Sequence, residues 1–133
     1  MTLLDTSVLI DALTGPRRSA PCLRRAIERG ERILIPSLVL YEWLRGPRLR
    51  EELAAQDALF PRASALPFGF EEAMMAARLY SLVRRPRGRE LDLAIAAHAL
   101  VWEAELWTLN LGDFRDIPGL RVSLPGGNVA RGR

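Results

Sequence analysis

Lysine is absent from this chain of 133 residues, although 19 arginines are present. A Walker-A phosphate loop and a Schiff-base enzyme both require a lysine, so the sequence excludes both classes. Proteins that form an aspartyl phosphate, such as haloacid-dehalogenase-type phosphatases and response-regulator receivers, also rely on a lysine and are disfavoured. A G+C-rich coding sequence is the ordinary explanation of the arginine bias.

Cysteine and long apolar segments are scarce as well. The one cysteine, Cys22, cannot form a disulfide within the chain, which agrees with a reducing, cytoplasmic location. No apolar run approaches the about 20 residues that cross a membrane. The chain enters a predicted strand at once, without a basic leader segment. We therefore expect a cytoplasmic protein with no signal peptide and no membrane association.

The composition is that of one globular domain, with 49% hydrophobic and 26% charged residues. The formal net charge is +3, which permits an anionic partner. Much of this excess lies in residues 84–89 and at the C-terminal end of the chain. We predict a domain over residues 1–124, followed by a basic, Gly-rich and disordered tail over residues 125–133.

Strands alternate with helices in the predicted secondary structure. Short apolar segments predict strands over residues 2–4, 32–35, 106–109 and 121–124, with a weaker candidate at 63–66. Amphipathic or alanine-rich segments predict helices over residues 6–13, 20–29, 38–44, 48–59, 70–83 and 91–104. This alternation predicts an α/β fold with helices on both faces of a mostly parallel sheet. The reactive crevice of such a sheet lies beyond the carboxyl ends of its strands.

Acidic and amide side chains follow the predicted strands. Asp5 ends the first strand, and Glu42 lies on the helix that follows the second. Asp92 opens the helix over residues 91–104, while Asn110 and Asp113 come after the strand over 106–109. A single Asp in such a place usually caps a helix. The apolar flanks of Glu42 (SLVLYEWL) are more informative, since a buried Glu normally has a partner or a metal.

Four acids at one edge of a sheet carry a large electrostatic cost. Two carboxylates about 5 Å apart repel by roughly 3 kcal/mol at an effective dielectric constant of about 20. Six such pairs would rival a whole folding free energy of about 5–15 kcal/mol. A chain that brings these acids together therefore needs divalent cations or shared protons. Oxygen ligands without a His or Cys cluster favour Mg²⁺ or Mn²⁺ over zinc.

Four segments of the chain, in order, resemble the PIN-domain ribonucleases: LLDTSVLIDAL, PSLVLYEWLRG, DLAIAAHAL and LWTLNLGDF…IPGL. The VapC-type toxins of bacterial toxin–antitoxin pairs match best, from about residue 2 to residue 124. The resemblance implies a small three-layer α/β/α domain that hydrolyses RNA phosphodiester bonds with Mg²⁺ or Mn²⁺. It also implies neutralisation by a small antitoxin protein, in a homodimer or a dimer of heterodimers.

The resemblance carries over to particular residues. Asp5 matches the first acid and the most central metal ligand, with the hydroxyl of Thr6 or Ser7 beside it. Glu42 matches the second acid, which holds a second ion or orients the attacking water, and Asp92 matches the third.

The fourth position of the family pattern has two candidates, Asn110 and Asp113. We favour Asp113, because Gly112 permits a tight turn that brings its carboxylate over the strand end. The predicted metal ligands are thus Asp5, Asp92 and Asp113, and Glu42 completes the catalytic set.

Other polar and aromatic residues have weaker cases. Arg87 and Arg89 are predicted to hold RNA phosphates, with a solvated basic loop as the alternative. His98 lies six residues after Asp92, on another side of the helix, and is assigned to the core.

Two other functions fit the same sequence. One is a PIN-type RNA-processing or flap-type nuclease that is not a toxin, which the short length of the chain disfavours. The other is a non-catalytic RNA-binding or protein-interaction domain, which the retained acids disfavour. The sequence leaves the RNA target and the number of metal ions open.

Overall fold

A five-stranded, mostly parallel sheet forms the centre of the computed structural model, which describes residues 1–127 and 130–131. Its strand order is β2-β1-β3-β4-β5. The first four strands are parallel to their neighbours, while β5 runs antiparallel to β4. The strands are β1 (Thr2–Leu4), β2 (Ile33–Leu34), β3 (Glu105–Trp107), β4 (Arg121–Ser123) and β5 (Ala130–Arg131).

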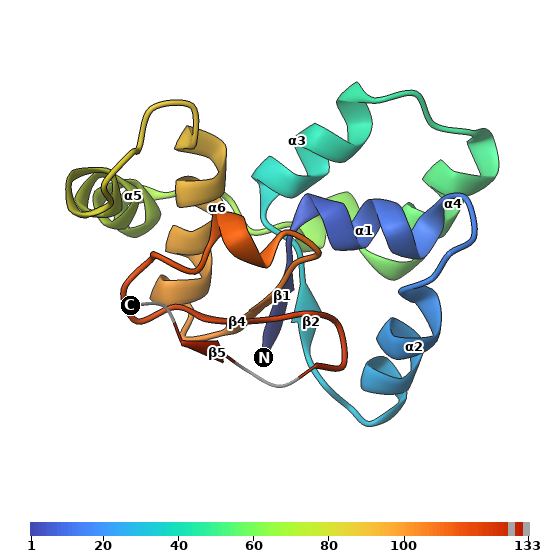
Figure 1. Cartoon of the computed structure of the whole chain (residues 1–133). Coiled ribbons are helices and arrows are strands. Elements are labelled where there is room, and N and C mark those ends of the chain that lie inside the picture. Colours follow the sequence, from blue (N-terminus) through green and yellow to red (C-terminus); the bar gives the residue numbers. More distant parts are fainter. Residues whose placement is uncertain (128–129, 132–133) are drawn as a thin grey trace.

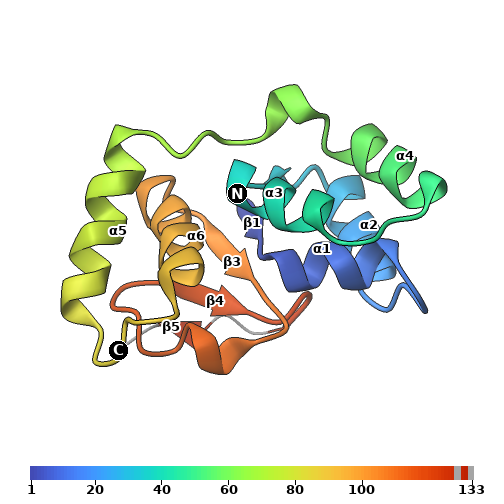
Figure 2. The same cartoon turned by 90° about the horizontal axis from the view of Figure 1, so that it is seen from above.

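Helices cover both faces of this sheet. Figures 1 and 2 show α1 and α2 on one side and α5 and α6 on the other, which confirms the predicted three-layer α/β/α architecture. The α-helices are α1 (Thr6–Leu13), α2 (Ala20–Glu28), α3 (Ser37–Arg45), α4 (Arg50–Leu59), α5 (Phe70–Leu82) and α6 (Glu90–Val101). Two 3₁₀ turns, η1 (Arg62–Ser64) and η2 (Leu111–Asp113), lie in the connections. Within the described residues, none of the helices combines the length and the apolar character needed to span a bilayer.

The most buried helix is α6, because it packs against the sheet on one side and α5 on the other (Figure 2). Every residue from Leu93 to Ala99 is buried, and the small alanine side chains allow this close approach. His98 is fully buried in this layer beside the ring of Phe68, and burial lowers its pKa. The assignment of His98 to the core is therefore confirmed.

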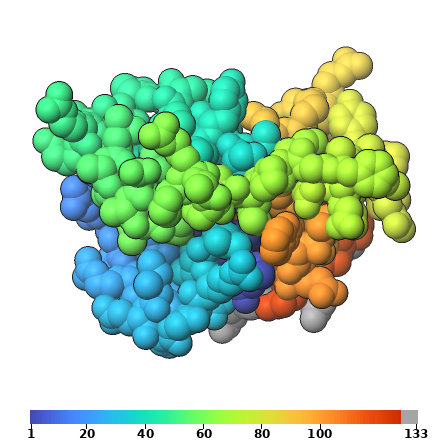
Figure 3. Space-filling view, turned by 180° about the vertical axis from the view of Figure 1, so that it is seen from behind, coloured from blue at the N-terminus to red at the C-terminus, as the bar shows by residue number. Residues whose placement is uncertain are grey.

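The prediction of a weak strand over residues 63–66 is wrong, because the structure has the 3₁₀ turn η1 over Arg62–Ser64. Only Leu66 pairs with the region that follows β2: its amide donates to the carbonyl of Ile35, and its carbonyl accepts from the amide of Ser37. The partner segment enters α3 at Ser37, so the pairing does not continue. Figure 3 shows this light-green connection as a band across the back of the molecule, between α4 and α5.

The strand β5 lies within the segment that the sequence pattern assigned to a tail. A turn at residues 124–127 reverses the chain, and Gly126 takes a φ of +73° there, which glycine adopts without strain. Ala130–Arg131 then pairs with β4. The other tail residues, 128–129 and 132–133, lie outside the described residues.

Candidate active site

The carboxyl edge of the sheet brings together the four acids that the sequence singles out. Asp5 follows β1, Glu42 lies on α3, Asp92 lies in the first turn of α6, and Asp113 ends η2. Burial, together with the charges of Asp5, Asp113 and Glu42, raises the pKa of Asp92 to about 6. Arg89 acts in the opposite direction. The acids therefore share one electrostatic environment.

Asp5 is held by two hydroxyl groups. Its side chain is 4% exposed, and Asp5 Oδ2 accepts hydrogen bonds from Ser7 Oγ (2.9 Å) and Thr108 Oγ1 (2.7 Å). These donors compensate the loss of water around the buried carboxylate. Asp5 is the N-cap residue of α1, but its side chain makes no capping hydrogen bond. Helix capping therefore does not explain why an Asp stands at this position.

Thr108 is a site residue that the sequence pattern did not single out. Leu4 pairs with Trp107 in parallel register, so the next residues, Asp5 and Thr108, leave the sheet side by side. Thr108 Oγ1 also accepts from the backbone amide of Asn110 (3.0 Å), which fixes the direction of its own proton toward Asp5. The strand predicted over residues 106–109 includes Thr108, whereas β3 ends at Trp107, so the sequence pattern gave no signal for this residue.

The hydroxyl pair after β1 serves two different acids. Thr6 Oγ1 donates to Glu42 Oε1 at 2.6 Å, whereas Ser7 donates to Asp5. Arg45 Nη2 lies 3.3 Å from Glu42 Oε2, so a cation also faces Glu42. Both hydroxyls that the sequence offered for this place are thus used, and α1 and α3 are joined at the site.

Asn110 and Asp113 have different surroundings. The backbone of Asn110 accepts from the amide of Asp113 (2.9 Å), but its exposed side chain makes no hydrogen bond within the described residues. Asp113 is also exposed, and its negative charge reaches Asp92 strongly enough to raise the pKa of that carboxyl. The charge of Asp113 therefore acts on Asp92, while the choice of Asp113 over Asn110 as the fourth acid stays a prediction.

The two arginines predicted to hold RNA phosphates also differ. Arg87 is exposed and forms no ion pair within residues 1–127. Arg89 is largely covered, and its guanidinium donates to the carboxylate of Asp116 and to the backbone carbonyl of Asp113. The phosphate-binding prediction therefore fits Arg87 better than Arg89.

The acids act on one another through their charges rather than through direct contact. Within the part of the chain that the structure describes, no group of three His, Cys, Asp or Glu side chains is arranged to enclose a metal ion. The available donors are carboxylate oxygens, with hydroxyl oxygens behind them, and such oxygens are the ligands that Mg²⁺ and Mn²⁺ prefer. The donor chemistry fits these ions, although the side chains do not form a closed shell.

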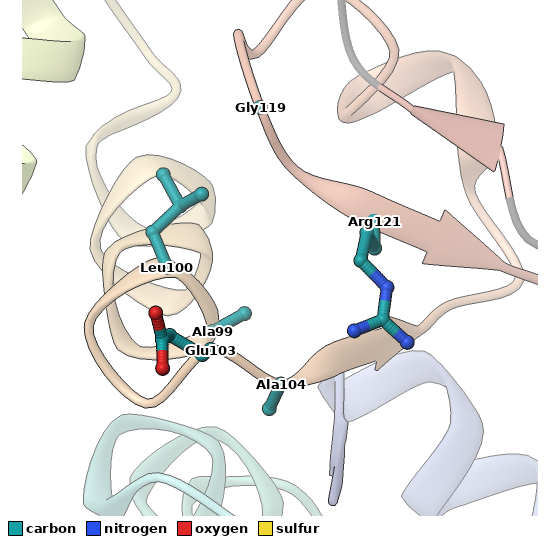
Figure 4. A pocket seen from close by; sticks show the side chains of 6 residues that line it. All are labelled: Ala99, Leu100, Glu103, Ala104, Gly119 and Arg121. Carbon is teal, nitrogen blue, oxygen red and sulfur yellow. The ribbon is translucent and has the colours of Figure 1, made fainter.

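A pocket of about 300 Å³ lies at the other end of α6 (Figure 4). Its two charged side chains, Glu103 and Arg121, lie on opposite sides of the pocket in this view. It contains none of the four acids, so it is separate from the candidate active site. Its lining comprises Ala99, Leu100, Glu103, Ala104, Gly119 and Arg121.

Known proteins share both this fold and this sequence pattern. A family model described as PIN domain matches residues 2–120. Ribonuclease VapC19 of Mycobacterium tuberculosis (strain H37Rv) is 36% identical over 126 residues, which cover 91% of this chain and 98% of that protein. The chain therefore belongs to the PIN-domain family and, within it, to the VapC group, as the resemblance implied.

Two solved structures place the fold among toxin–antitoxin complexes. A chain of a toxin–antitoxin complex from Klebsiella pneumoniae is 28% identical, with a TM-score of 0.70 over 94% of this chain and 98% of that one. A chain of the DNA-bound VapBC complex from Salmonella typhimurium is 23% identical, with a TM-score of 0.73 over 92% of this chain and 96% of that one. At 23% identity, the likeness to the Salmonella typhimurium chain shows a shared fold and no more.

We expect Asp92→Asn to be more stable than the native chain above pH 7. The pKa of Asp92 is about 6 in the folded protein against an ordinary value of 3.8, so the folded state binds this proton more tightly. The native chain therefore loses stability as the pH rises from about 4 to about 6. Each pH unit corresponds to about 1.4 kcal/mol before solvent screening, so the variant should gain about 1–2 kcal/mol.

Urea unfolding of both proteins at pH 4, 6 and 8, without divalent cations, measures this difference. Asp57→Asn, on the exposed surface of α4, is the matched control and should follow the native pH profile. Parallel profiles for the native chain and Asp92→Asn would contradict the shared environment of the acids.

Proposed function

We propose that this VapC-type protein is an Mg²⁺- or Mn²⁺-dependent endoribonuclease toxin that a cognate antitoxin neutralises. The observation that carries the proposal is the convergence of Asp5, Glu42, Asp92 and Asp113, expressed in the raised pKa of Asp92. The ribonuclease name of the 36% identical relative supports RNA as the substrate. The RNA target stays open.

In this proposal Asp5, Asp92 and Asp113 hold the metal ion, directly or through water. A bound Mg²⁺ or Mn²⁺ supplies an activated water and stabilises negative charge on the phosphoryl oxygens. The donor set suits these ions, because it consists of oxygen atoms without a His or Cys cluster. The half-buried carboxylate of Asp92 accepts no hydrogen bond from the described residues, so it is the acid whose charge most needs a cation.

The remaining groups of the site orient the acids and the substrate. Ser7 and Thr108 direct both of their protons at one oxygen of Asp5, which fixes the orientation of that carboxylate. Thr6 holds one oxygen of Glu42, so the other oxygen faces Arg45 and is in place to orient the attacking water.

The exposed arginines next to α6 supply attraction for the RNA backbone. Arg84, Arg85 and Arg87 are exposed and lie in the connection that enters α6 shortly before Asp92. Phosphate contacts of this kind position a nucleic acid without reading its sequence. We assign to Arg87 the phosphate contact closest to the acids.

An apolar groove at the other end of the molecule supports a protein partner. It measures about 300 Å³ and lies between α1, α2 and α4, which Figure 2 shows together at the end away from α5. Exposed Ile27 and Leu59 line it. Its charged lining residues are Arg17, Arg24 and Glu28, so the excess charge is positive. A helix with an apolar face and acidic flanks fits such a groove. We propose the antitoxin as its occupant, in a homodimer or a dimer of heterodimers.

The first prediction from this proposal concerns activity and metal. Asp5→Asn should abolish cleavage of a mixed RNA pool and leave the fold intact, because it removes a charge from the acid cluster. EDTA in excess should stop cleavage by the native chain. Millimolar Mn²⁺ should raise the melting temperature of the native chain more than that of Asp5→Asn, because selective binding stabilises the folded state.

Asp57→Asn serves again as the control and should cleave as the native chain does. Cleavage that persists in EDTA would exclude the metal mechanism. RNA binding without cleavage by the native chain would favour the non-catalytic alternative.

The second prediction concerns the fourth acid. Asp113→Asn should lose most of the activity and bind Mn²⁺ more weakly, because the charge of Asp113 acts on Asp92. Asn110→Ala should cost less, because the contacts of Asn110 are made by its backbone. Titration calorimetry with Mn²⁺, together with cleavage rates, ranks the two variants, and the opposite order would assign the fourth position to Asn110.

The third prediction concerns the antitoxin. Ile27→Asp and Leu59→Asp should each weaken the complex, because a carboxylate would enter the apolar groove, and RNA cleavage should be unchanged. Leu82→Asp, at an exposed position on α5 outside the groove, is the control. The chain is co-expressed with the small protein encoded by the neighbouring gene, and size-exclusion chromatography then measures complex formation. An unaltered complex with both groove variants would place the antitoxin elsewhere.

A further inference from the structure

Arg89 joins the two segments that carry Asp92 and Asp113. It immediately precedes α6, and its guanidinium reaches the segment that follows η2. Arg89 Nη1 lies 2.8 Å from Asp116 Oδ2, and Arg89 Nη2 lies 2.6 Å from Asp116 Oδ1. The same Nη2 donates to the backbone carbonyl of Asp113 at 2.9 Å. One side chain thus holds both a carboxylate and a main-chain group across 24 to 27 residues of sequence.

The geometry of this contact requires an arginine. Two parallel N–H groups meet the two oxygens of Asp116, and the same fork supplies the bond to the main chain. A lysine ammonium has no planar fork and does not reproduce this set. The side chain of Arg89 is 21% exposed and that of Asp116 is 46% exposed, so water screens the pair mainly from the side of Asp116.

The contact opposes a repulsion that the site itself creates. Asp92, in the first turn of α6, and Asp113, at the end of η2, carry like charges at the same edge of the sheet and repel each other. Within the short turn η2, Leu111 packs against the core, whereas Gly112 and Asp113 are exposed and would relieve this repulsion by moving outward. Phe114 and Ile117, just beyond it, are buried and anchor the following segment in the core. Loss of the Arg89 contact would therefore shift Asp113 without unfolding this part of the chain.

We propose that Arg89, through Asp116, is a positioning residue that sets the separation of Asp92 and Asp113 and thereby the affinity of the site for a divalent cation. This inference rests on the proposed function, because it assigns a task within the same acid cluster. Arg89 then acts on the acids rather than on the RNA, in contrast with Arg87.

The test compares Arg89→Ala, Asp116→Ala and the double variant with the native chain. The readouts are Mn²⁺ affinity by titration calorimetry, kcat and KM on RNA, and the melting temperature without metal. Each single variant should bind Mn²⁺ about 10- to 100-fold more weakly, as is usual when a residue that orients a metal ligand is lost. The double variant should be no weaker than the single ones, because both changes remove the same link. Arg89→Lys should not restore the affinity.

The kinetic constants separate positioning from substrate binding. The positioning role predicts a lower kcat with little change in KM for Arg89→Ala, and a raised KM for Arg87→Ala. Arg115→Ala is the matched control, because Arg115 is exposed on the same segment and forms no ion pair within residues 1–127; it should bind Mn²⁺ as the native chain does.

Native Mn²⁺ affinity in Arg89→Ala would overturn the inference, and so would additive losses in the double variant. A raised KM with an unchanged kcat would assign Arg89 to phosphate binding instead and overturn it too. Failure of the proposed function has a different signature, since the native chain itself would then neither bind Mn²⁺ nor cleave RNA.

Discussion

The parallel pairing of β1 with β3 is the constraint on which the site depends. In parallel strands both carboxyl ends reach the same edge of the sheet, whereas antiparallel strands would send them to opposite edges. Leu4 faces Trp107 in this register, so Asp5 and Thr108 leave the sheet as neighbours. Because β2 is also parallel to β1, α3 starts at the same edge and adds Glu42. The helix α6 leads back to the start of β3, so its first turn, with Asp92, lies at that edge as well. The positions of the acids thus follow from the connectivity of the fold.

The acids gathered in this way are compensated unequally. Asp5 receives two hydroxyl protons, and Glu42 receives one hydroxyl proton and faces Arg45. Asp113 lies in solvent, where water screens its charge. Asp92 is half-buried and accepts no hydrogen bond from the described residues. Burial and the neighbouring charges therefore favour its protonated form, which raises its pKa. The raised pKa of one carboxyl is therefore the local expression of a charge imbalance in the whole cluster.

The sequence predicted what depends on periodicity and strand order, and missed what depends on contacts between distant segments. Apolar segments and their polar ends were sufficient to place β1, α6 and Asp5, because burial dictates those patterns. The role of Thr108 depends on the register between β1 and β3, which no local pattern records. The pair of Arg89 with Asp116 spans 27 residues and requires the η2 turn to be in place. The strand expected at 63–66 is replaced by the 3₁₀ turn η1, and the segment after β2, which would pair with it, enters α3 at Ser37, so only one bridge forms between them within the described residues.

The acidic site and an RNA substrate carry like charges and repel each other. The distribution of positive charge on the chain offsets this repulsion. The net charge is +3 although the site is acidic, so the positive charge lies elsewhere on the surface. The exposed arginines of residues 84–87 precede α6, whereas Arg89 in the same segment turns inward to the acids. In the proposed function the outer arginines attract the RNA backbone, while a divalent cation reverses the local sign at the acids. Metal and RNA binding are then coupled with positive sign, because each lowers the electrostatic cost of the other. Without the cation, the arginines would still attract RNA, but a phosphodiester would be repelled from the catalytic position.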